Sequence, residues 1–317
     1  MSVSDDRVIE IVEFCLEYGD DKTVDTYDLT HESLAVYKRR YKNQLFPDKY
    51  KKKKLLQDIA DKYSDSELLA ISKGSQELEQ GRKTLSFDGE KVSFYAFTDT
   101  HFGSKYTNLD NYKSMCDVIN NDKDCQFVVH CGDVTEGMSN RQGHIYELTH
   151  LGFEEQKEHS VEMLDMIKAK KYMISGNHDR WFFKQNGADI VKQICAECQD
   201  AEFLGHDEGD LVVNGARIKL WHGLDGSSYA TSYRLQKLIE SFTGGQKPNV
   251  LICGHTHKQG YFFERHIHAI TAGCIESQSK WMRGKKLAAH TGFWKISMTV
   301  QKKFVTSFTT TWFPFYE

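Results

Sequence analysis

The sequence has no run of about 18 consecutive apolar residues, the length that a membrane-spanning helix requires. Its first residues, MSVSDDRVIE, are acidic and lack the apolar core of a signal peptide. Internal repeats and low-complexity tracts are also absent, apart from a short run of lysines. These absences argue against a membrane protein and a repeat protein, and we expect a cytoplasmic protein with no membrane partner.

The eight cysteines show no spacing typical of a disulfide framework. Several of them lie in apolar runs, such as FVVHCGD and VLICGH, where a small buried thiol is the ordinary expectation. Cys195 and Cys198 form a single CxxC pair inside a segment with a helical pattern. One pair without a second is weak support for zinc, so we interpret both as structural thiols.

The composition is that of an ordinary globular protein, with 317 residues, 39% of them hydrophobic and 27% charged. This length exceeds what one small core needs and predicts a large domain with a smaller one. We place a helical domain at residues 1–84 and a second domain at residues 85–317.

The first domain has a helical pattern. The segment RVIEIVEFCLEYG carries an apolar stripe that includes Val8 and Val12, and it ends at Gly19. Thr30 is placed to cap a later helix, HESLAVYKRRY, whose C-terminal end is basic. Helix, turn, short helix and capped basic helix are the plan of a helix-turn-helix module. A further helical stretch would end at Gly74, followed by a polar linker at residues 75–82.

The formal net charge of −4 conceals a locally basic stretch in this domain. Its cations are interleaved with tyrosines, a combination suited to contact with nucleic acid. The predicted nucleic-acid-binding residues are Lys38, Arg39, Arg40, Lys42, Lys51, Lys52, Lys53 and Lys54. The alternative is a solvated basic face on a helical packing domain.

From about Lys83 the pattern changes to short strand-like runs that alternate with helical segments. Examples are VSFYAFTD followed by DNYKSMCDVIN, and QFVVHCGD followed by EEQKEHSVEMLDMIKA. This alternation predicts an α/β sheet with helices on its faces. The last third of the chain is richer in strands, so we expect a second, partly antiparallel sheet there.

Potential metal ligands follow the strand-like runs. Five short motifs end these runs: DTH, GD, GNHD, HG and GHTH. Because sites in α/β sheets form outside the carboxyl ends of the strands, we expect the motifs to converge in one crevice. Carboxylate, amide oxygen and imidazole together suit Mn²⁺, Fe or Zn²⁺. The candidate ligands are Asp99, His101, Asp133, Asn177, His222, His255 and His257.

These motifs, written out as DTHFG, GDVTEG, GNHD, WHG and GHTH, resemble the signature of the calcineurin-like metallophosphoesterase superfamily over about residues 90–275. The resemblance implies a four-layer β-sandwich flanked by helices and a centre of two divalent metal ions. It places Asp99, His101 and His257 on the first ion. It places Asn177, His222 and His255 on the second, with Asp133 as the bridge. The ions would be Mn²⁺ in first place, with Fe, Zn²⁺ or Ni²⁺ as alternatives.

The implied chemistry is hydrolysis of a phosphate ester. Two cations about 3.5–4 Å apart lower the pKa of a bridging water, so that hydroxide exists near neutral pH. They also offset the charge that develops on the phosphate oxygens. His178 would protonate the leaving oxygen, and Asp179 would fix the orientation of its ring. Asp179 could instead cap a helix, and Arg180 could contact phosphate or remain a surface charge.

Two departures narrow the substrate class. Protein phosphatases of this superfamily have GDxVDRG and RGNHE, where this chain has GDVTEG and SGNHD. The GNHD form is similar to phosphodiesterases and SbcD-type repair nucleases. The segments DKYSDSELLAISKG, HGLDGSSYATSYRLQKLIE and SKWMRGKKLAAHTGFW are similar to phage and prophage phosphoesterases with an N-terminal helix-turn-helix. The resemblance therefore implies a DNA nuclease, exonuclease-like, in repair or processing.

Two other functions stay open. One is a phosphodiesterase or phosphatase for small or cyclic nucleotides, and the other is a DNA-binding regulator with a vestigial esterase domain. The expected partners are DNA and, as in SbcD-type nucleases, a second copy of the chain; a phage-encoded protein would act in the host cytoplasm. The histidines outside the motifs are expected on the surface or behind the ligands: His144, His150, His159, His266 and His268.

Overall fold

The computed structural model describes residues 3–45, 55, 62, 82–223, 230–243, 245 and 247–316. The chain divides into two compact units, Met1–Gln80 and Gly81–Glu317. Among the described residues, no helix combines the length and the apolar character needed to cross a bilayer.

The smaller unit is helical. Its elements are α1 (Asp5–Tyr18), α2 (Asp20–Tyr27), α3 (His31–Arg40) and the π-helix η1 (Tyr41–Leu45). The expected end of the first helix at Gly19 is confirmed, because this glycine adopts φ 88°. The expected cap is confirmed too, since the Thr30 hydroxyl accepts a hydrogen bond from the Ser33 amide at 3.1 Å. The predicted third helical stretch and the linker lie outside the described residues, except for Leu55, Lys62 and Arg82.

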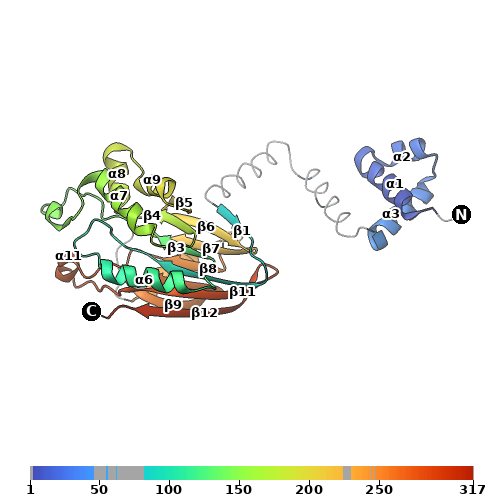
Figure 1. Ribbon diagram of the computed structural model, residues 1–317. Helices are drawn as coiled ribbons and strands as arrows, with labels where there is room; N and C mark the ends of the chain where they lie inside the picture. Colours follow the sequence, from blue (N-terminus) through green and yellow to red (C-terminus); the bar gives the residue numbers. More distant parts are fainter. Residues whose placement is uncertain are drawn as a thin grey trace. The chain divides into compact units, whose positions relative to one another are not determined.

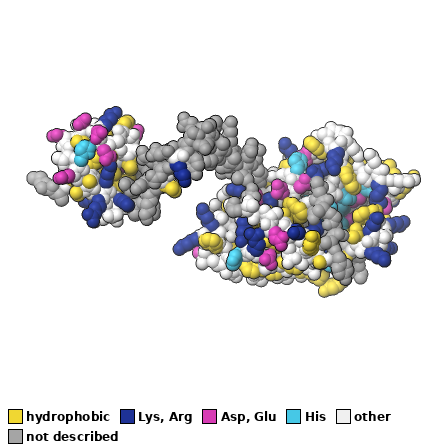
Figure 2. Space-filling model, turned by 180° about the vertical axis from the view of Figure 1, so that it is seen from behind, with side chains coloured by type: hydrophobic (Ala, Val, Ile, Leu, Met, Phe, Trp, Pro, Cys, Tyr) yellow, Lys and Arg dark blue, Asp and Glu magenta, His cyan; other side chains and the backbone are white. Residues whose placement is uncertain are grey.

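The helices of this unit pack through the predicted apolar stripe. Val8 and Val12 of α1 contact Tyr41, while Ile11 and Cys15 contact Leu34 of α3. The surface carries both acidic and basic side chains (Figure 2). The amphipathic stripe of α1 therefore organises the packing of the unit.

The larger unit contains two six-stranded sheets (Figure 1). The first sheet contains, in spatial order, β12 (Phe304–Pro314), β11 (Gly292–Gln301), β2 (Lys91–Phe97), β3 (Phe127–Cys131), β4 (Lys171–Ser175) and β5 (Ala201–His206). The second contains β1 (Arg82–Leu85), β6 (Glu208–Val213), β7 (Ala216–Trp221), β8 (Val250–Cys253), β10 (Ile267–Ala272) and β9 (Gln259–Glu264).

The first sheet combines a parallel core with an antiparallel edge. Strands β2 to β5 run parallel, while β11 pairs antiparallel with both β2 and β12. We expected the late strands to build the second sheet, and this was wrong for β11 and β12. Their long hairpin turns back to the first sheet because the apolar face of β11 fills the core beside β2.

The second sheet is mixed. Strand β7 is antiparallel to β6 and parallel to β8, and β10 is parallel to β8 but antiparallel to β9. The run GYFFERHIHAITAG is a hairpin of two strands, with Arg265 and His266 in left-handed conformation at the turn. Strand β1 pairs with β6, so the predicted division between residues 84 and 85 falls inside a strand of this sheet.

The layers follow from the buried faces. The main core lies between the two sheets and includes Phe94, Val129 and Ile174 from one and Ile218 and Ile252 from the other. A second core lies under helices on the outer face of the first sheet: α6 (Leu109–Asn121), α7 (Gly152–Leu164) and α9 (Ile190–Glu197). Helix α10 (Tyr233–Ser241) covers the outer face of the second sheet. The predicted four-layer sandwich is confirmed.

Candidate metal centre

The five ligand motifs follow the carboxyl ends of five strands. Three of these strands, β2, β3 and β4, are neighbours in the first sheet, and β7 and β8 are neighbours in the second. The site therefore lies where the same ends of both sheets meet, and loops from each sheet supply side chains to it. This placement is the expected one for an α/β fold.

The ligand-bearing backbone is strained. Asp99, His101, Asp133, His255 and His257 all adopt left-handed φ angles, between 47° and 75°. A residue with a side chain enters this region at a cost of order 1–2 kcal/mol, somewhat less for aspartate. The surrounding structure must hold these turns, which is typical of functional sites.

The glycines beside the ligands are needed mainly because a side chain there would collide with neighbouring atoms. A Cβ on Gly176 would lie 2.2 Å from Oδ1 of Asp133 and 2.7 Å from Nε2 of His222. A Cβ on Gly254 would lie 2.4 Å from the Thr98 hydroxyl. Neither of these glycines has a positive φ, whereas Gly132, with φ 94°, occupies a left-handed turn that favours glycine.

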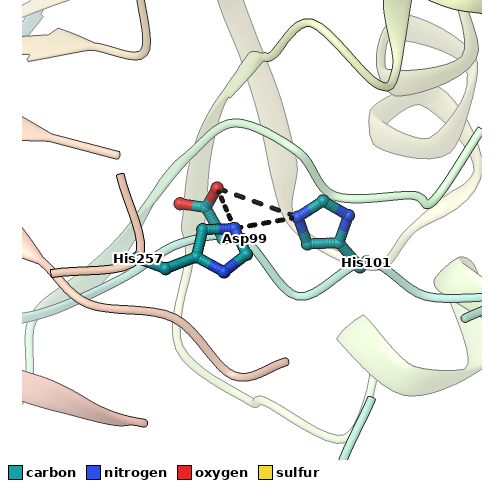
Figure 3. Close-up of side chains that lie close together, drawn as sticks. All are labelled: Asp99, His101 and His257. Atoms are coloured by element: carbon teal, nitrogen blue, oxygen red, sulfur yellow. Dashed lines mark hydrogen bonds and ion pairs between the residues drawn. The ribbon is translucent and has the colours of Figure 1, made fainter. Parts of the chain in front are cut away.

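The first ligand group contains Asp99, His101 and His257 (Figure 3). Oδ1 of Asp99 lies 3.2 Å from Nε2 of His257 and 3.8 Å from Nε2 of His101. The two imidazole nitrogens lie 3.3 Å apart. Ligands about 2.1 Å from one ion are roughly 3–4 Å from each other, so these atoms are spaced as the shell of a single cation.

Hydrogen bonds orient the ligand atoms of this group towards one another. Oδ2 of Asp99 accepts from the Thr98 hydroxyl and from the amide of His255, while the buried Oδ1 has no hydrogen-bond partner. Nδ1 of His101 donates to a carboxylate oxygen of Glu136 at 2.8 Å, which leaves Nε2 with a lone pair. An orphaned buried carboxylate oxygen beside imidazole lone pairs fits a cation.

The second ligand group contains Asp133, His222 and His255. Nε2 of His222 lies 3.1 Å from Oδ2 of Asp133 and 3.2 Å from the amide oxygen of Asn177. Nδ1 of His222 is held by the carbonyl of Cys131 at 2.7 Å. His222 therefore presents Nε2 to the same space as the two oxygens.

Asp133 lies between the two groups. Its Oδ2 lies 3.9 Å from Nε2 of His101 in addition to 3.1 Å from Nε2 of His222. Its Oδ1 accepts from the amide of His178 at 2.8 Å. The structure thus brings the seven sequence-predicted ligands together, and their assignment to two ions stays a proposal.

The electrostatics of the protein without metal show the affinity of the cluster for positive charge. Burial alone raises the pKa of Asp133, but the charges of His222 and His178 outweigh it and lower that pKa. Burial lowers the pKa of His222, yet Asp133 raises it to about 9. Burial lowers the pKa of His255 to about 4, so this ring is neutral and ready to bind a metal. Metal ions would replace the shared protons.

Glu136 was missed as a functional residue, although it lies inside GDVTEG. It is 5% exposed, and its two carboxylate oxygens accept from Nδ1 of His101 and, at 2.7 Å, from Nε2 of His144. Its main-chain carbonyl accepts from Nδ1 of His178 at 2.9 Å. One residue thus orients a predicted ligand and the predicted proton donor.

The predicted contact between Asp179 and the His178 ring is wrong. The Asp179 carboxylate accepts from the amides of Val134, Thr135 and Gly176 and from the Thr135 hydroxyl, at 2.8–3.1 Å. It lies at the start of α8 (Arg180–Asn186) without a capping bond to that helix. Asp179 therefore joins the loops after β3 and β4, because buried amides there need an acceptor.

Glu276 was also missed, because it lies in no motif. It is 4% exposed, and its Oε2 lies 3.9 Å from Nε2 of His101. Its other oxygen accepts from the Ser104 hydroxyl at 2.9 Å. The distance to His101 matches those of Asp99 and Asp133, so Glu276 offers the first group a further oxygen.

Arg180 neither enters the site nor remains a free surface charge. Its guanidinium pairs with Asp207 at 2.6 Å. Of the histidines outside the motifs, His144 is buried behind the ligands on Glu136, and His150 stacks on His159 with ring centroids 4.0 Å apart. His266 is exposed and His268 stacks on Phe308, so both lie apart from the ligand groups.

The predicted nucleic-acid-binding cations are only partly available. Lys38 pairs with Asp20 and Arg40 pairs with Asp5, so both connect α3 to the other helices of their unit. Arg39 and Lys42 are exposed. Lys51, Lys52, Lys53 and Lys54 lie outside the described residues.

The cysteines carry no sign of metal binding. All eight are free thiols, and Cys195 and Cys198 are buried. Burial raises the pKa of Cys198 to about 12 and that of Cys195 further, which opposes the thiolate that a metal needs. Within the described part of the chain, neither joins a group of potential ligands.

The centre opens into a cavity of about 460 Å³. His178, whose side chain is 23% exposed, lies in the wall of this cavity. Trp181 packs against its ring, with 4.0 Å between the ring centroids and an angle of 36° between the planes. Residues from other loops complete the wall: Ser139, Arg141, Glu147, Glu276, Ser279, Trp281, Met282 and Leu287. The site thus combines buried donors with a wide opening.

Known proteins resemble this chain in the same region. It is 23% identical over 232 residues to the DNA polymerase II small subunit of Methanothermobacter thermautotrophicus, with 59% of this chain and 48% of the relative covered. The chain therefore spans about half the length of that relative.

Solved structures with similar folds include an archaeal phosphodiesterase, which is 17% identical with a TM-score of 0.41 and covers 70% of this chain and 100% of its own. Vps29 with Zn²⁺ from Entamoeba histolytica is 12% identical, with a TM-score of 0.37 and coverage of 70% and 99%.

The match to a family agrees with the geometry. Residues 92–289 match the calcineurin-like phosphoesterase superfamily domain. This span includes the seven candidate ligands, His178, Glu136 and Glu276. The chain belongs to the calcineurin-like phosphoesterase superfamily.

Proposed function

We propose that this protein is a metal-dependent phosphodiesterase that acts on nucleic acid. The observation that carries the proposal is the buried donor set, in which Asp133 lies between the two ligand groups and lines the cavity together with His178. Buried carboxylates and imidazoles gathered this closely fit two divalent cations. A vestigial esterase domain would not need to keep a complete set of metal ligands. The set therefore disfavours the alternative of a DNA-binding regulator.

The residues divide into ligands and a proton donor. Asp99, His101 and His257 would hold the first ion, Asn177, His222 and His255 would hold the second, and Asp133 would serve both. When bound, the ions supply an acidified water and neutralise charge on the phosphate. The mixture of oxygen and nitrogen donors, with Glu276 nearby, favours Mn²⁺ over Zn²⁺.

His178 is oriented to protonate the leaving oxygen. Its Nδ1–H is committed to the carbonyl of Glu136, so Nε2 is the atom left for the substrate. Burial lowers the pKa of this ring, but Asp133 and Glu136 outweigh burial and raise it. The ring then carries the proton that departure of an alkoxide requires.

Three features support nucleic acid as the substrate. The motifs depart from those of protein phosphatases, the cavity wall contains two tryptophans, and a distant relative is a DNA polymerase subunit. Within this proposal, the finer assignment is a DNA exonuclease of the SbcD-like branch, of the phage type.

The N-terminal unit has the outline of a helix-turn-helix, because three residues, Asp28 to Thr30, separate α2 from α3. Its charge is unfavourable for DNA, however. Residues 3–45 contain ten acidic and six basic side chains, and Lys38 and Arg40 are already paired. DNA binding by this unit would therefore depend on Arg39 and the lysines at 51–54.

The size of the cavity favours a second candidate, a phosphodiesterase for small or cyclic nucleotides. Pockets for small ligands commonly measure about 300–1,000 Å³. The cavity of about 460 Å³ lies in this range.

The deciding experiment measures hydrolysis with Mn²⁺, Zn²⁺ or Ni²⁺ after removal of metal by chelation. The substrates are bis-p-nitrophenyl phosphate, p-nitrophenyl phosphate, single- and double-stranded DNA, RNA and cyclic dinucleotides. We expect metal-dependent cleavage of the diester and of DNA, with little activity on the monoester.

Cleavage of the small diester without cleavage of any nucleic acid would exclude the proposed nuclease activity. Cleavage of cyclic dinucleotides alone would establish the second candidate. A protein that binds no metal, cleaves nothing and still shifts DNA would be a regulator.

A further inference from the structure

A segment beside the metal centre projects an aromatic ring next to the cavity. Helix α11 (Lys280–Gly284) begins after Ser279, and Ser279, Trp281, Met282 and Leu287 line the cavity. Trp281 is 48% exposed, whereas Met282 is 5% exposed and anchors the segment. About half of the Trp281 side chain is therefore accessible beside the cavity.

The same segment is strongly basic. Lys280, Arg283, Lys285 and Lys286 are all exposed. No acidic residue occurs between Glu276 and Glu317, and these cations form no ion pair with a described carboxylate. The positive charge at this edge of the cavity is therefore not neutralised from within its own segment.

The segment is also held in a fixed conformation. The Ser279 hydroxyl accepts from the amide of Met282, and the Leu287 amide donates to the Met282 carbonyl at 2.9 Å. The side-chain amide of Gln278 donates to the carbonyl of Leu287 at 2.6 Å. The loop therefore presents Trp281 and the cations without first having to be ordered, which favours binding.

The second tryptophan of the cavity has another role. Trp181 stacks on His178 and contacts His144 with ring centroids 5.5 Å apart. Its ring is already used against the proton donor. Trp281 is therefore the better candidate for a free stacking surface.

We propose that residues 279–287 bind single-stranded nucleic acid at the entrance to the metal centre. Trp281 stacks on a base, and Lys280, Arg283, Lys285 and Lys286 contact phosphates on either side. Alternating cations and an exposed aromatic ring are the means by which single strands are bound without sequence preference. A paired base is not available for stacking on a side chain, which selects single strands. The inference rests on the proposed function, because it concerns the substrate of the same site.

The test is binding of a fluorescein-labelled single-stranded oligonucleotide to full-length protein in EDTA, followed by fluorescence anisotropy across a salt series. Trp281→Ala should weaken binding by at least about 5-fold, and Trp281→Phe should retain most of it. Lys285→Gln with Lys286→Gln should reduce the slope of log affinity against log salt by about 1.4.

The matched controls lie in the turn between β11 and β12, where Lys302, Lys303 and Phe304 are exposed and line no part of the cavity. Lys302→Gln with Lys303→Gln, and Phe304→Ala, should bind as the wild type does. Unfolding midpoints of all variants establish that each is folded. If Trp281→Ala does not fold, the Lys285→Gln and Lys286→Gln double variant still tests the segment.

Equal affinity of Trp281→Ala, the Lys285→Gln and Lys286→Gln double variant and the controls would overturn the inference. Equally tight wild-type binding of a duplex would overturn the selection of single strands. Hydrolysis of bis-p-nitrophenyl phosphate by the wild type is measured in parallel. Its absence would refute the proposed function, while the anisotropy data still decide the binding site.

Discussion

Nδ1 of His178 lies 2.9 Å from the main-chain carbonyl oxygen of Glu136. The side chain of Glu136 meanwhile holds His101 and His144. A main-chain acceptor cannot be removed by substitution, so the orientation of His178 depends on the conformation of the loop after β3. The proton donor and the first ligand group are thus coupled through one residue.

Replacement of His178 should separate chemistry from metal binding. His178→Asn should retain two metal ions per chain and lose about 10²- to 10⁴-fold in turnover, because it removes a proton donor and no predicted ligand. Asp133→Asn should lose both metals and activity, because it weakens the shared ligand. Metal content by plasma mass spectrometry and diester hydrolysis check this pair. Equal metal loss in both variants would contradict the division of roles.

Replacement of Asp179 should destabilise the fold. Asp179→Ala leaves three buried amides without an acceptor, and we expect a loss of roughly 3 kcal/mol or more in the free energy of unfolding. Urea unfolding in EDTA measures it. The control is Asp189→Ala, which removes the cap on the Lys192 amide and should cost about 1 kcal/mol. Equal losses would show that the network around Asp179 is less important than its geometry indicates.

Neutralisation of Glu276 should lower the affinity of the first ligand group for its metal ion. Glu276→Gln keeps the shape of the side chain but removes a charge 3.9 Å from Nε2 of His101. We expect about a 10- to 100-fold lower affinity for Mn²⁺ in titrations against a fluorescent chelator. Glu264→Gln, an exposed residue outside the cavity, should behave as the wild type. An unchanged affinity would place Glu276 outside the metal environment.

The left-handed backbone at His257 predicts that glycine and alanine variants rank in opposite order of stability at His257 and at His222. At His257, with φ 53°, glycine should give a metal-free protein up to about 1 kcal/mol more stable than alanine does, because glycine tolerates left-handed φ. At His222, which has no positive φ, alanine should be the more stable replacement. Urea unfolding of the four variants in EDTA gives the comparison. The same order at both positions would argue against strain at His257.

His130 should make the metal-free protein less stable in acid. Its Nδ1 accepts from the Gly132 amide and its Nε2 donates to the Thr100 hydroxyl, which itself donates to the Val134 carbonyl. These bonds require the neutral ring, and burial lowers its pKa to about 3. Because the unfolded ring titrates near 6.5, the unfolded state binds the proton first as pH falls.

The resulting loss of stability begins below about pH 6.5 and continues towards pH 3. Between pH 7 and pH 5 the wild type should lose about 2 kcal/mol more than His130→Gln. Urea unfolding in EDTA at both pH values measures the difference. Other titrating groups are common to the two proteins, so parallel losses would show that His130 is not held neutral.

The sequence by itself determined the local features. The apolar stripe of α1, the end at Gly19 and the cap at Thr30 follow from nearest neighbours along the chain, as do strands such as β2, β3 and β4. The ligand motifs were visible too, because each combines a glycine with a polar residue at a strand end. Hydrophobic periodicity and turn-forming residues depend on a few neighbouring positions, so they can be identified without the tertiary structure.

Only the tertiary structure decided which sheet β11 and β12 join, where the Asp179 carboxylate points and how close Glu276 comes to His101. Glu276 lies 175 residues from His101 along the chain, yet 3.9 Å separates Oε2 from Nε2. Such contacts depend on how two sheets pack and how buried amides find acceptors, and neither leaves a periodic pattern in the sequence. The sequence thus indicated the candidate metal ligands, while the tertiary structure decided which residues orient and surround them.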